Sequence, residues 1–445
     1  MKTVVAIATA HGVGSVAIVR VSGPAALELA KRLSNRKTFT PRFATLSPIF
    51  SYDGALIDKA LVIYFQAPKS FTGEDVIEFQ CHGGIMVASM VLETLIKHGA
   101  TLAMPGEFSK RAFLNGRMDL SQAQAVSDLI EAKSEDAVRI LARQMEGSLG
   151  VFVEEARDNL LKIIAHVEVS IDYADDDLPD DLLFKINKNL DNLETKLTKI
   201  TESSKQRKGL IHGFRIAIIG KPNVGKSSLL NALLKSERAI ISDIAGTTRD
   251  TIEEELRIGT HLVKIIDTAG IRLSEDKIEQ IGISRSRQAA KDADIIIALF
   301  DASADADEQD VEILSLVEEF SEKKTCFYVL NKADLPQVFK IDYLSNKSIK
   351  LSANIDVSPL IKALSIHLDS QEIGSDVLLT SHYQIDKVST ALEAIKEAKT
   401  LLDEGSLELF AFHLQEAVHA FGAITRPYGA DEVLDKMFGD FCLGK

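Results

Sequence analysis

Gly220-Lys221-Pro222-Asn223-Val224-Gly225-Lys226-Ser227 is the stretch of sequence that decides the fold of the central part of the chain. It has the spacing GxxxxGK[ST], and it stands between a β-rich run, Arg215–Ile219, and a helical run, Ser228–Leu234. In this strand–loop–helix order the glycines turn backbone N–H groups toward phosphates, and the following helix presents its positive end. The alternative, a glycine-rich turn without a ligand, does not explain this placement.

The residues of this loop have separate expected roles. Lys226 is expected to bridge the β- and γ-phosphates of a nucleotide, and the Ser227 hydroxyl to take one ligand position on Mg²⁺. The motif therefore predicts a nucleoside triphosphate with magnesium. The residues expected to contact the phosphates are Asn223, Val224, Gly225, Lys226, Ser227 and Ser228.

A second motif identifies the base. Asn331-Lys332-Ala333-Asp334 follows the β-rich run Cys326–Leu330, at the carboxyl end of a strand, where α/β proteins bind ligands. The Asp334 carboxylate can accept hydrogen bonds from both N1 and the exocyclic amine of guanine, whereas adenine has an acceptor at N1 and would leave it unpaired. Ser352-Ala353-Asn354, after the next strand, is expected to present a backbone N–H to guanine O6. The predicted ligand is a guanine nucleotide.

Two further motifs belong to the phosphate side of the site. Gly246-Thr247-Thr248-Arg249-Asp250 comes first, and Asp267-Thr268-Ala269-Gly270 ends another strand-like run. Asp267 is expected to hold Mg²⁺ through water, Gly270 to sense the γ-phosphate, and Thr248 to complete the metal shell when GTP is bound. The order of these motifs is that of a GTPase that alternates between GTP and GDP.

The usual catalytic glutamine is missing. Its position is Ile271, which has no hydrogen-bonding side chain, so another group must orient the attacking water. Glu279 is the preferred candidate, and its alternative role is a surface residue of a switch helix. Asn223 and the backbone carbonyls of Ser242–Ala245 are suited to hold a monovalent cation, which would do the electrostatic work of an arginine finger. Ser242 and Thr247 are also expected to contact GTP.

The chain divides into four segments that differ in the spacing of their apolar residues and turn signals. Residues 1–118 alternate β-rich runs with turns around one periodic helix, Ile85–His98, as in an α+β unit. Residues 119–212 and 368–445 have helical spacing, and 213–367 alternates strands and helices as in a parallel doubly wound sheet. The α/β domain is thus expected to be inserted into one helical domain. The predicted strands are Val4–Ala8, Val16–Val21, Ala60–Phe65, Val76–Cys81, Arg215–Ile219, Leu262–Ile266, Ile295–Phe300, Cys326–Leu330 and Ile349–Leu351.

Length and charge limit the kinds of protein that the chain can be. The chain has 445 residues, too many for one core, and a net charge of −14. Residues 1–118 hold 13 Lys and Arg against 8 Asp and Glu, a balance of +5, which leaves −19 for the remainder. This basic part suggests an anionic ligand such as tRNA or a polyglutamylated cofactor, with scatter of surface charge as the alternative.

The compartment is predicted from what the sequence lacks. Its longest apolar runs are far shorter than the roughly 20 residues of a membrane span. The three cysteines form no CxxC pair and indicate neither a disulfide framework nor a zinc site. The apolar N-terminus is too short for a secretory signal and is expected to be a buried strand. A cytoplasmic protein without a membrane span is expected.

The sequence resembles the MnmE/TrmE family of tRNA wobble-uridine modification GTPases over essentially the whole chain. Beyond the GTPase motifs, the resemblance rests on Ser70-Phe71-Thr72-Gly73-Glu74-Asp75, Cys81-His82-Gly83-Gly84, Pro105-Gly106-Glu107-Phe108, Arg111-Ala112-Phe113-Leu114-Asn115 and Phe441-Cys442-Leu443-Gly444-Lys445. It implies an N-terminal folate-binding fold that dimerises, followed by a helical domain that carries the inserted GTPase domain.

The resemblance also implies an activity and partners. With a flavin- and NADH-dependent partner of the MnmG/GidA type, in a heterotetramer, a homodimer of this family adds an aminomethyl or carboxymethylaminomethyl group to C5 of the wobble uridine in certain tRNAs. The one-carbon unit comes from a tetrahydrofolate derivative (methylene- or formyl-tetrahydrofolate). Potassium-dependent dimerisation of the GTPase domains drives the cycle.

Site residues follow from the same resemblance. The implied K⁺ ligands are Asn223 with the backbones of Ser242, Ile244 and Thr247, and the implied catalytic carboxylate is Glu279. The positions that contact folate in the family match Arg20, Glu78, Arg117 and Lys445.

Four residues of the matching motifs and positions depart from the family pattern or have a second interpretation. Arg117 stands where lysine is common in the family, and Cys81 stands where glycine is more usual. Taken alone, a strand-end arginine such as Arg20 is more often part of a surface ion pair. Cys442 is open to two interpretations, a nucleophile or a buried structural thiol.

Two other functions compete with a tRNA-modifying enzyme. One is a GTPase switch in ribosome assembly or signalling, which needs no folate-like domain in residues 1–118. The other is a dimeric scaffold with a degenerate nucleotide site, against which the intact Lys226, Ser227, Asp267 and Asp334 count.

Overall fold

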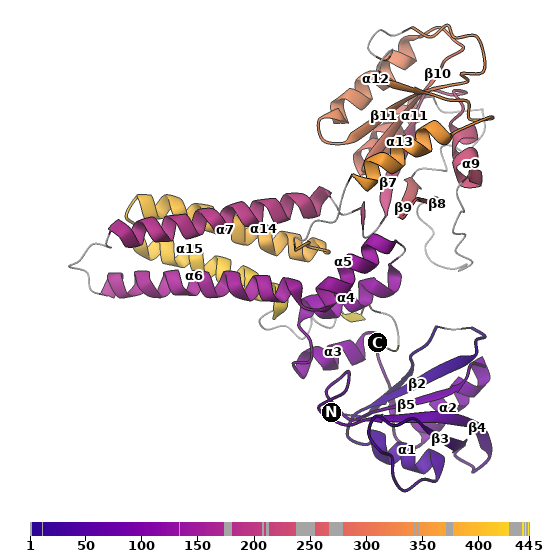
Figure 1. Ribbon diagram of the computed structural model, residues 1–445, viewed down its shortest axis with the longest axis vertical. Coiled ribbons are helices and arrows are strands. Elements are labelled where there is room, and N and C mark those ends of the chain that lie inside the picture. Colours follow the sequence, from indigo (N-terminus) through magenta and orange to yellow (C-terminus); the bar gives the residue numbers. More distant parts are fainter. Residues whose placement is uncertain are drawn as a thin grey trace. The chain divides into compact units, whose positions relative to one another are not determined.

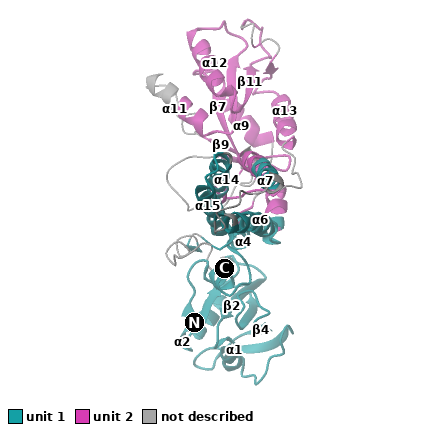
Figure 2. Cartoon of the chain, turned by 90° about the vertical axis from the view of Figure 1, so that its left-hand side faces the viewer, with its two compact units in different colours: residues 1–130, 143–195, 386–445 teal, residues 131–142, 196–385 magenta. Residues whose placement is uncertain are grey.

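The computed structural model describes residues 2–10, 12–132, 134–172, 180–206, 209–210, 213–236, 254–266, 279–340, 344, 347–370, 377–426, 438–439, 441 and 444. The chain forms two compact units (Figure 2). The first contains residues 1–130, 143–195 and 386–445, and the second contains residues 131–142 and 196–385. Within the described part of the chain, no helix has the length and apolar character of a membrane span.

The first unit begins with a six-stranded sheet of strand order β3-β4-β5-β2-β1-β6. Its neighbours are antiparallel except for β1 and β6, which run parallel. Four of its strands and one helix fall on predicted runs, while β3, β6, α1 and α3 were not predicted. The elements are β1 (Val4–Ile7), β2 (Val16–Ser22), α1 (Ala26–Ser34), β3 (Thr45–Phe50), β4 (Leu56–Phe65), β5 (Val76–His82), α2 (Ile85–Lys97), β6 (Thr101–Leu102) and α3 (Glu107–Leu114).

Strand alternation divides the side chains of this sheet between two faces. Val19, Val21 and Phe79 point to the face that packs against α1 and α2 and forms the main core of this sheet. Val4 and Ala6 belong to a second cluster with Phe108 of α3. The two faces therefore have different neighbours, and the α3 face carries the polar residues described below.

The rest of the first unit is helical, as the leucine-rich spacing predicts. α6 packs along α15, with buried leucines, valines and isoleucines of α6 against buried phenylalanines of α15 (Figure 1). Helices α5, α7 and α14 each have residues in both compact units. The helices are α4 (Leu120–Glu131), α5 (Glu135–Met145), α6 (Ser148–Asp172), α7 (Asp180–Gln206), α14 (His382–Asp403) and α15 (Leu407–Thr425).

The second unit contains a six-stranded sheet of order β12-β11-β10-β7-β9-β8. All described pairs are parallel except β8 with β9. Every predicted strand of this region is present, and β8 is an additional one. The elements are β7 (Phe214–Ile219), α9 (Lys226–Ser236), β8 (Glu254–Ile258), β9 (His261–Ile266), α11 (Glu279–Asp292), β10 (Ile295–Asp301), α12 (Glu308–Ser321), β11 (Thr325–Asn331), β12 (Ser348–Lys350) and α13 (Ser358–Asp369).

Helices cover both faces of this sheet. Buried leucines of α9 and α13 pack on one face against alternate residues of β7, β9 and β10. Residues of α11 and α12 pack on the other face. Strand β10 is buried along its whole length, which explains its unbroken apolar sequence. This is the doubly wound α/β arrangement, whose ligand site lies at the carboxyl ends of the strands.

Candidate functional site

The GxxxxGK[ST] loop connects β7 to α9 at the carboxyl end of the parallel sheet (Figure 1). Gly225 has φ +99°, and a Cβ atom there would lie 2.3 Å from Nδ2 of Asn331. A Cβ atom on Gly220 would lie 2.5 Å from the carbonyl oxygen of Leu299. Both glycines are therefore required by the close approach of residues in the neighbouring strands β10 and β11, in addition to any phosphate contact.

Asn331 joins three loops of the site. Its Nδ2 donates to the Val224 carbonyl oxygen at 2.8 Å, and its Oδ1 accepts from the Ala353 backbone N–H at 2.8 Å. The side chain is buried, so both hydrogen bonds are protected from water. The phosphate loop, the NKxD loop and the Ser352-Ala353-Asn354 loop thus have a fixed mutual position, as the sequence motifs required.

Lys226 is positioned at the first turn of α9. Its Nζ donates to the carbonyl oxygens of Gly220 at 2.7 Å and Lys221 at 2.8 Å, and neither partner carries a charge. Burial lowers the pKa of Lys226 below its ordinary value. A partly buried ammonium with these partners is suited to receive an anion.

Lys221 of the same loop has a role that the sequence did not suggest. Its Nζ contacts Asp307 at 2.7 Å and the fully buried Asp310 at 2.6 Å. These two aspartates form the capping box of α12. Burial alone would lower the pKa of Lys221, but the hydrogen bonds to both carboxylates raise it overall. The Asp-x-x-Asp spacing at the start of a helix is the sequence signal that could have indicated this capping box.

The NKxD loop is held by a similar pair. Nζ of Lys332 contacts Asp301 at 2.6 Å, and Lys332 itself has φ +60°. Burial would raise the pKa of Asp301, but hydrogen bonds from Lys332 and Ser303 lower it overall. Asp334 is exposed at this edge, where a base can reach its carboxylate.

The remaining loop residues differ in burial. Ser352 and Ala353 are buried, whereas Asn354, Asn223 and Ser227 are exposed. Asn223 has φ +63°, a conformation that asparagine tolerates better than most residues. The exposed Asn223 and Ser227 therefore lie on the side of the loop that is open to ligands.

Part of the predicted site lies outside the described residues. Glu279 is the first residue of α11, and its side chain is not among the described ones. The other predicted residues outside the described part are Ser242, Ile244, Thr247, Thr248, Asp267, Thr268, Ala269, Gly270, Cys442 and Lys445.

A second polar site lies on the α3 face of the N-terminal sheet. Arg20 of β2 and Glu78 of β5 are direct register partners, and their side chains form an ion pair of 2.9 Å. The Arg20 guanidinium also lies 5.6 Å from the ring centres of Phe71 and Phe108. The structure thus brings together two of the four residues that the family resemblance assigned to folate.

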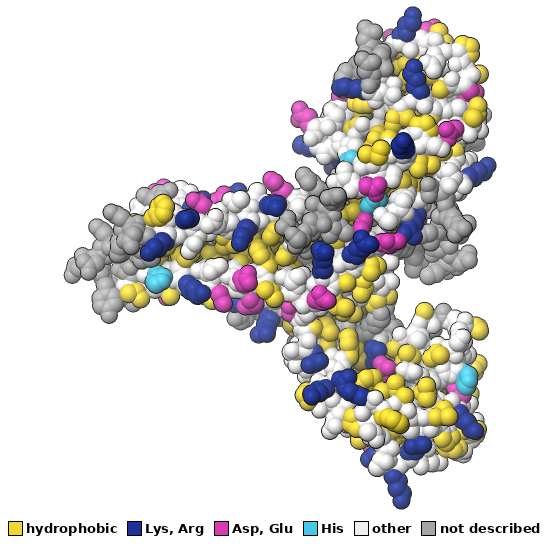
Figure 3. All heavy atoms as spheres, in the orientation of Figure 1, with side chains coloured by type: hydrophobic (Ala, Val, Ile, Leu, Met, Phe, Trp, Pro, Cys, Tyr) yellow, Lys and Arg dark blue, Asp and Glu magenta, His cyan; other side chains and the backbone are white. Residues whose placement is uncertain are grey.

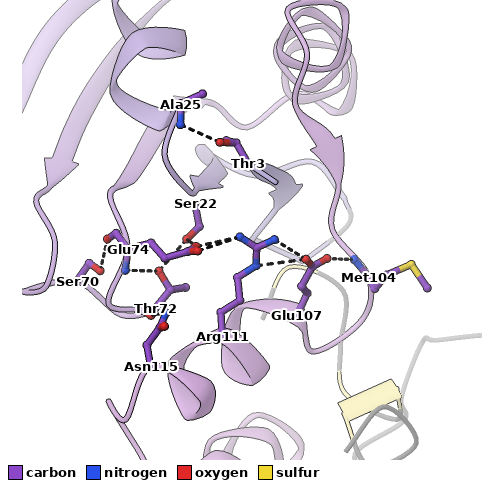
Figure 4. Close-up of polar contacts among 10 residues, drawn as sticks. All are labelled: Thr3, Ser22, Ala25, Ser70, Thr72, Glu74, Met104, Glu107, Arg111 and Asn115. Atoms are coloured by element: carbon purple, nitrogen blue, oxygen red, sulfur yellow. Dashed lines mark hydrogen bonds and ion pairs between the residues drawn. The ribbon is translucent and has the colours of Figure 1, made fainter. Parts of the chain in front are cut away.

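A charged network fixes the neighbouring loop (Figure 4). The guanidinium of Arg111, which is only 7% exposed, contacts Glu74 at 2.9 Å and Glu107 at 2.7 Å. Ser22 Oγ donates to Glu74 Oε2 at 2.7 Å and contacts Thr72 Oγ1 at 2.7 Å. The loop from Ser70 to Asp75 is therefore attached to both β2 and α3. These motifs were recognisable in the sequence, but only the structure shows that their side chains form one network.

Arg117 reaches the same loop from the end of α3. Its Nε donates to the Ser70 carbonyl oxygen at 3.2 Å. A Cβ atom on Gly73, which has φ +77°, would lie 3.2 Å from Cγ of Arg117. Arg117 is otherwise exposed, so its guanidinium is accessible beside the loop that carries Phe71.

The C-terminal tail packs on this domain. A Cβ atom on Gly106 would lie 2.3 Å from the Phe438 carbonyl oxygen, and Phe438 packs near the ring of Phe113. A Cβ atom on Gly444 would lie 2.3 Å from the carbonyl oxygen of Ile7 in β1. The end of the chain therefore approaches the strand next to Arg20.

Comparison with known proteins shows the family of the chain. The MnmE helical domain family matches residues 120–442, and the family described as GTP-binding protein TrmE N-terminus matches residues 3–117. A protein of Sulfurimonas denitrificans named tRNA modification GTPase MnmE is 55% identical over 443 residues, covering 100% of this chain and 99% of its own. A protein of the same name from Aliarcobacter butzleri is 54% identical with the same coverage.

Solved structures resemble part of the chain. Era in complex with MgGDPNP and nucleotides 1506–1542 of 16S ribosomal RNA is 25% identical, covering 41% of this chain and 66% of Era, with a TM-score of 0.27. The FeoB G-domain from Methanococcus jannaschii is 27% identical, covering 35% of this chain and 98% of its own, with a TM-score of 0.24.

Proposed function

The chain belongs to the MnmE family, and from this we propose that it is a GTPase that acts in tRNA modification. The observation that carries the proposal is the arrangement around Lys226 and Asn331, where three loops are held together beside a partly buried ammonium. This arrangement occurs in a chain that matches named tRNA modification GTPases over its full length.

The phosphate end of the site follows from the contacts of Lys226. Transfer of its Nζ from two neutral carbonyl oxygens to the β- and γ-phosphates replaces weak partners by charged ones, in a partly buried place where such bonds are strong. Mg²⁺, when bound, neutralises phosphate charge, and Ser227 and Thr248 would hold it. GTP and GDP share the β-phosphate, so Lys226 would contact both.

The base end relies on Asp334 and the loop after β12. The exposed Asp334 carboxylate accepts from the N1–H and amino group of guanine, and the Ser352-Ala353-Asn354 loop offers a backbone N–H to O6. Asn331 keeps that loop in register by accepting from Ala353 N–H. Adenine would leave the carboxylate unpaired, so guanine is selected.

We extend the proposal to the hydrolytic step. Glu279 is the carboxylate that orients water, since it begins the helix that follows the DxxG motif and Ile271 cannot do so. Asn223 and the backbones of Ser242, Ile244 and Thr247 would hold K⁺, whose charge stabilises the charge that develops on the phosphates. The exposure of Asn223 supports this assignment.

We further propose a tetrahydrofolate derivative as the one-carbon donor. The Arg20–Glu78 pair fits a pterin, because the carboxylate can accept from its amino and ring N–H groups while the guanidinium donates to its carbonyl. Phe71, half-buried beside Arg20, provides apolar surface for a planar ring. Arg117 and Lys445 would contact the anionic tail of the ligand.

The product of this chemistry would be an aminomethyl or carboxymethylaminomethyl group at C5 of the wobble uridine. A flavin-containing partner of the MnmG/GidA type would supply the redox chemistry in a heterotetramer with a homodimer of this chain. The protein would act in the cytoplasm.

Reconstitution tests this function. The reaction mixture contains the purified chain, the flavin partner, NADH, glycine or ammonia, methylene-tetrahydrofolate, GTP and unmodified tRNA. The wobble nucleoside is then identified by mass spectrometry. The expected result is a C5-substituted uridine with wild-type protein and none with Glu279→Ala. GTP turnover with unchanged uridine in the complete mixture would contradict the proposal and favour a GTPase switch in ribosome assembly or signalling.

A further inference from the structure

Asp310 of α12 is a charged residue in a fully buried place. Its side chain is 0% exposed, and its Oδ1 has no hydrogen-bond partner among the described residues. Charged side chains normally lie at the surface, and Figure 3 shows acidic and basic side chains scattered over the outside of the second unit. A buried carboxylate costs free energy unless a cation offsets it. The cation here is Lys221, whose Nζ lies 2.6 Å from Asp310 Oδ2.

The cap of α12 does not account for this charge. Asp310 Oδ2 accepts from the Asp307 backbone N–H at 3.1 Å, a contact that a neutral amide side chain would also make. The helix dipole favours a negative charge in the first turn, but Glu308 supplies one there without being buried. The charge of Asp310 is therefore explained by its partner in the phosphate loop, Lys221.

Lys221 connects the start of α12 with the ammonium of Lys226. Its side chain is only 13% exposed, and its Nζ also lies 2.7 Å from Asp307. The backbone carbonyl oxygen of the same residue accepts from Lys226 Nζ at 2.8 Å. An anchor on the Lys221 side chain therefore also fixes a carbonyl group that holds Lys226.

Two other positions of the phosphate loop are fixed by other elements. A Cβ atom on Gly220 would lie 2.5 Å from the carbonyl oxygen of Leu299 in β10, and the Val224 carbonyl oxygen accepts from Asn331 of β11 at 2.8 Å. With Lys221, the loop is attached at its first, second and fifth residues to three different elements. A phosphate loop binds an anion through backbone N–H groups that must point inward together. Anchors that hold this conformation before the ligand arrives lower the cost of ordering the loop on binding.

We propose that Lys221 is a positioning residue, which holds the phosphate loop in its nucleotide-binding conformation through its ion pair with Asp310. The proposal rests on the proposed function, and it adds that α12, which carries none of the nucleotide-binding motifs, sets the affinity of the site. The anchor acts alike on GTP, on GDP and on the transition state. Its loss is therefore expected to raise KM and to leave kcat unchanged.

Nucleotide binding to the full chain tests this proposal. GDP that carries a methylanthraniloyl fluorophore is titrated into wild type, K221M, D310N and K221M/D310N. K221M is expected to weaken binding about tenfold, and D310N about threefold because Asp307 still pairs with Lys221. K221M/D310N should bind no more weakly than K221M, since both substitutions remove one interaction. The kcat at saturating GTP should stay within about twofold of wild type.

The double variant also protects the test against unfolding. K221M leaves the Asp310 carboxylate buried without its cation, whereas K221M/D310N contains no such charge. E319Q is the control, because Glu319 in the last turn of α12 pairs with Arg287 of α11 and removal of that pair leaves the phosphate loop attached. E319Q is expected to bind GDP like wild type.

Four results would overturn the proposal. Weak binding by K221M with wild-type binding by D310N would mean that Lys221 contacts the phosphates directly. Wild-type affinity in all three variants would mean that the ion pair only stabilises the fold. Losses that multiply in K221M/D310N, or a fall in kcat with unchanged KM, would also contradict it. Each of these results leaves the proposed function standing, whereas absence of GDP binding by wild type would overturn both.

Discussion

Lys226 contacts two neutral carbonyl oxygens, so its removal leaves no charged partner unpaired. We expect Lys226→Ala to reduce GTP turnover by about 10²–10³-fold, because a charge that stabilises the transferring phosphoryl group is lost. The melting temperature should change little. Steady-state turnover and thermal unfolding measure both effects.

Lys235→Ala is the control, since Lys235 is exposed at the other end of α9. Retained turnover in Lys226→Ala would mean that the site is not catalytic.

Asp334 determines the base through the direction of its hydrogen bonds. Asp334→Asn replaces one acceptor oxygen by an NH₂ group, which faces the amino group of guanine unfavourably. Xanthine has a carbonyl oxygen at that place. The variant is therefore expected to lose roughly 10³-fold or more in affinity for GTP and to gain affinity for xanthosine triphosphate. Competition binding of the two nucleotides checks this, and unchanged preference for GTP would remove Asp334 from the base site.

Asn223 provides a test of the proposed cation. Hydrolysis by wild type is expected to be faster in K⁺ than in Na⁺ at equal ionic strength, because the larger ion fits a site made of an amide oxygen and backbone carbonyls. Asn223→Ala should lose this difference while it still binds GDP. Equal wild-type rates in the two salts would argue against a cation at this position.

At the scale of elements, the charged network of Figure 4 attaches the Ser70–Asp75 loop to α3. Arg111→Ala would leave Glu74 and Glu107 without their cation, and removal of one partner of a buried ion pair costs about 3–5 kcal/mol. Hydrogen exchange of β2 and β5 amides in the full chain measures this loss.

Arg32 is the comparison for that variant. Its side chain is 58% exposed and lies 3.8 Å from Glu28. Arg32→Ala is expected to cost less than about 1 kcal/mol. Equal effects of the two substitutions would mean that the network does not hold the loop.

The sequence predicted the inner strands of both sheets and the edge strand β12, and it missed β3, β6 and β8. All three are edge strands. β3 contains Pro48, β6 has two residues, and β8 begins with two glutamates, so none has an apolar run. Inner strands such as β10 are buried on both faces and carry an unmistakable pattern. Burial on both faces requires a continuous apolar run, and this run is what makes an inner strand predictable from the sequence.

The candidate sites also contain features that the sequence predicts and features that it does not. The Asn331 and Lys226 motifs were predicted because ligand chemistry fixes residue types at close spacing. The contacts of Lys221 with Asp307 and Asp310, and those of Arg111 with Glu74, join residues far apart in the sequence. Pair contacts of this kind leave no periodic signal in a single chain, so they required the structure.

At the scale of the whole molecule, the second unit includes more than the GTPase motifs. Residues 131–142 belong to it, and Glu135 and Asp136 of α5 contact Arg257 and His261 at 3.2 and 3.4 Å. His261 also contacts Asp369 at 3.0 Å. Since β9 begins at His261 and leads to the DxxG motif, α5 is attached to a strand of the nucleotide site. The predicted boundaries at 212 and 367 remain predictions.

The central claim is that GTP hydrolysis by this chain is used to modify a tRNA uridine. Nucleoside mass spectrometry of tRNA from cells that lack the gene tests it most directly, with complementation by wild type and by Lys226→Ala. The account predicts loss of a C5-substituted uridine, restored by wild type and not by Lys226→Ala. An unchanged uridine profile in cells that lack the gene would contradict it.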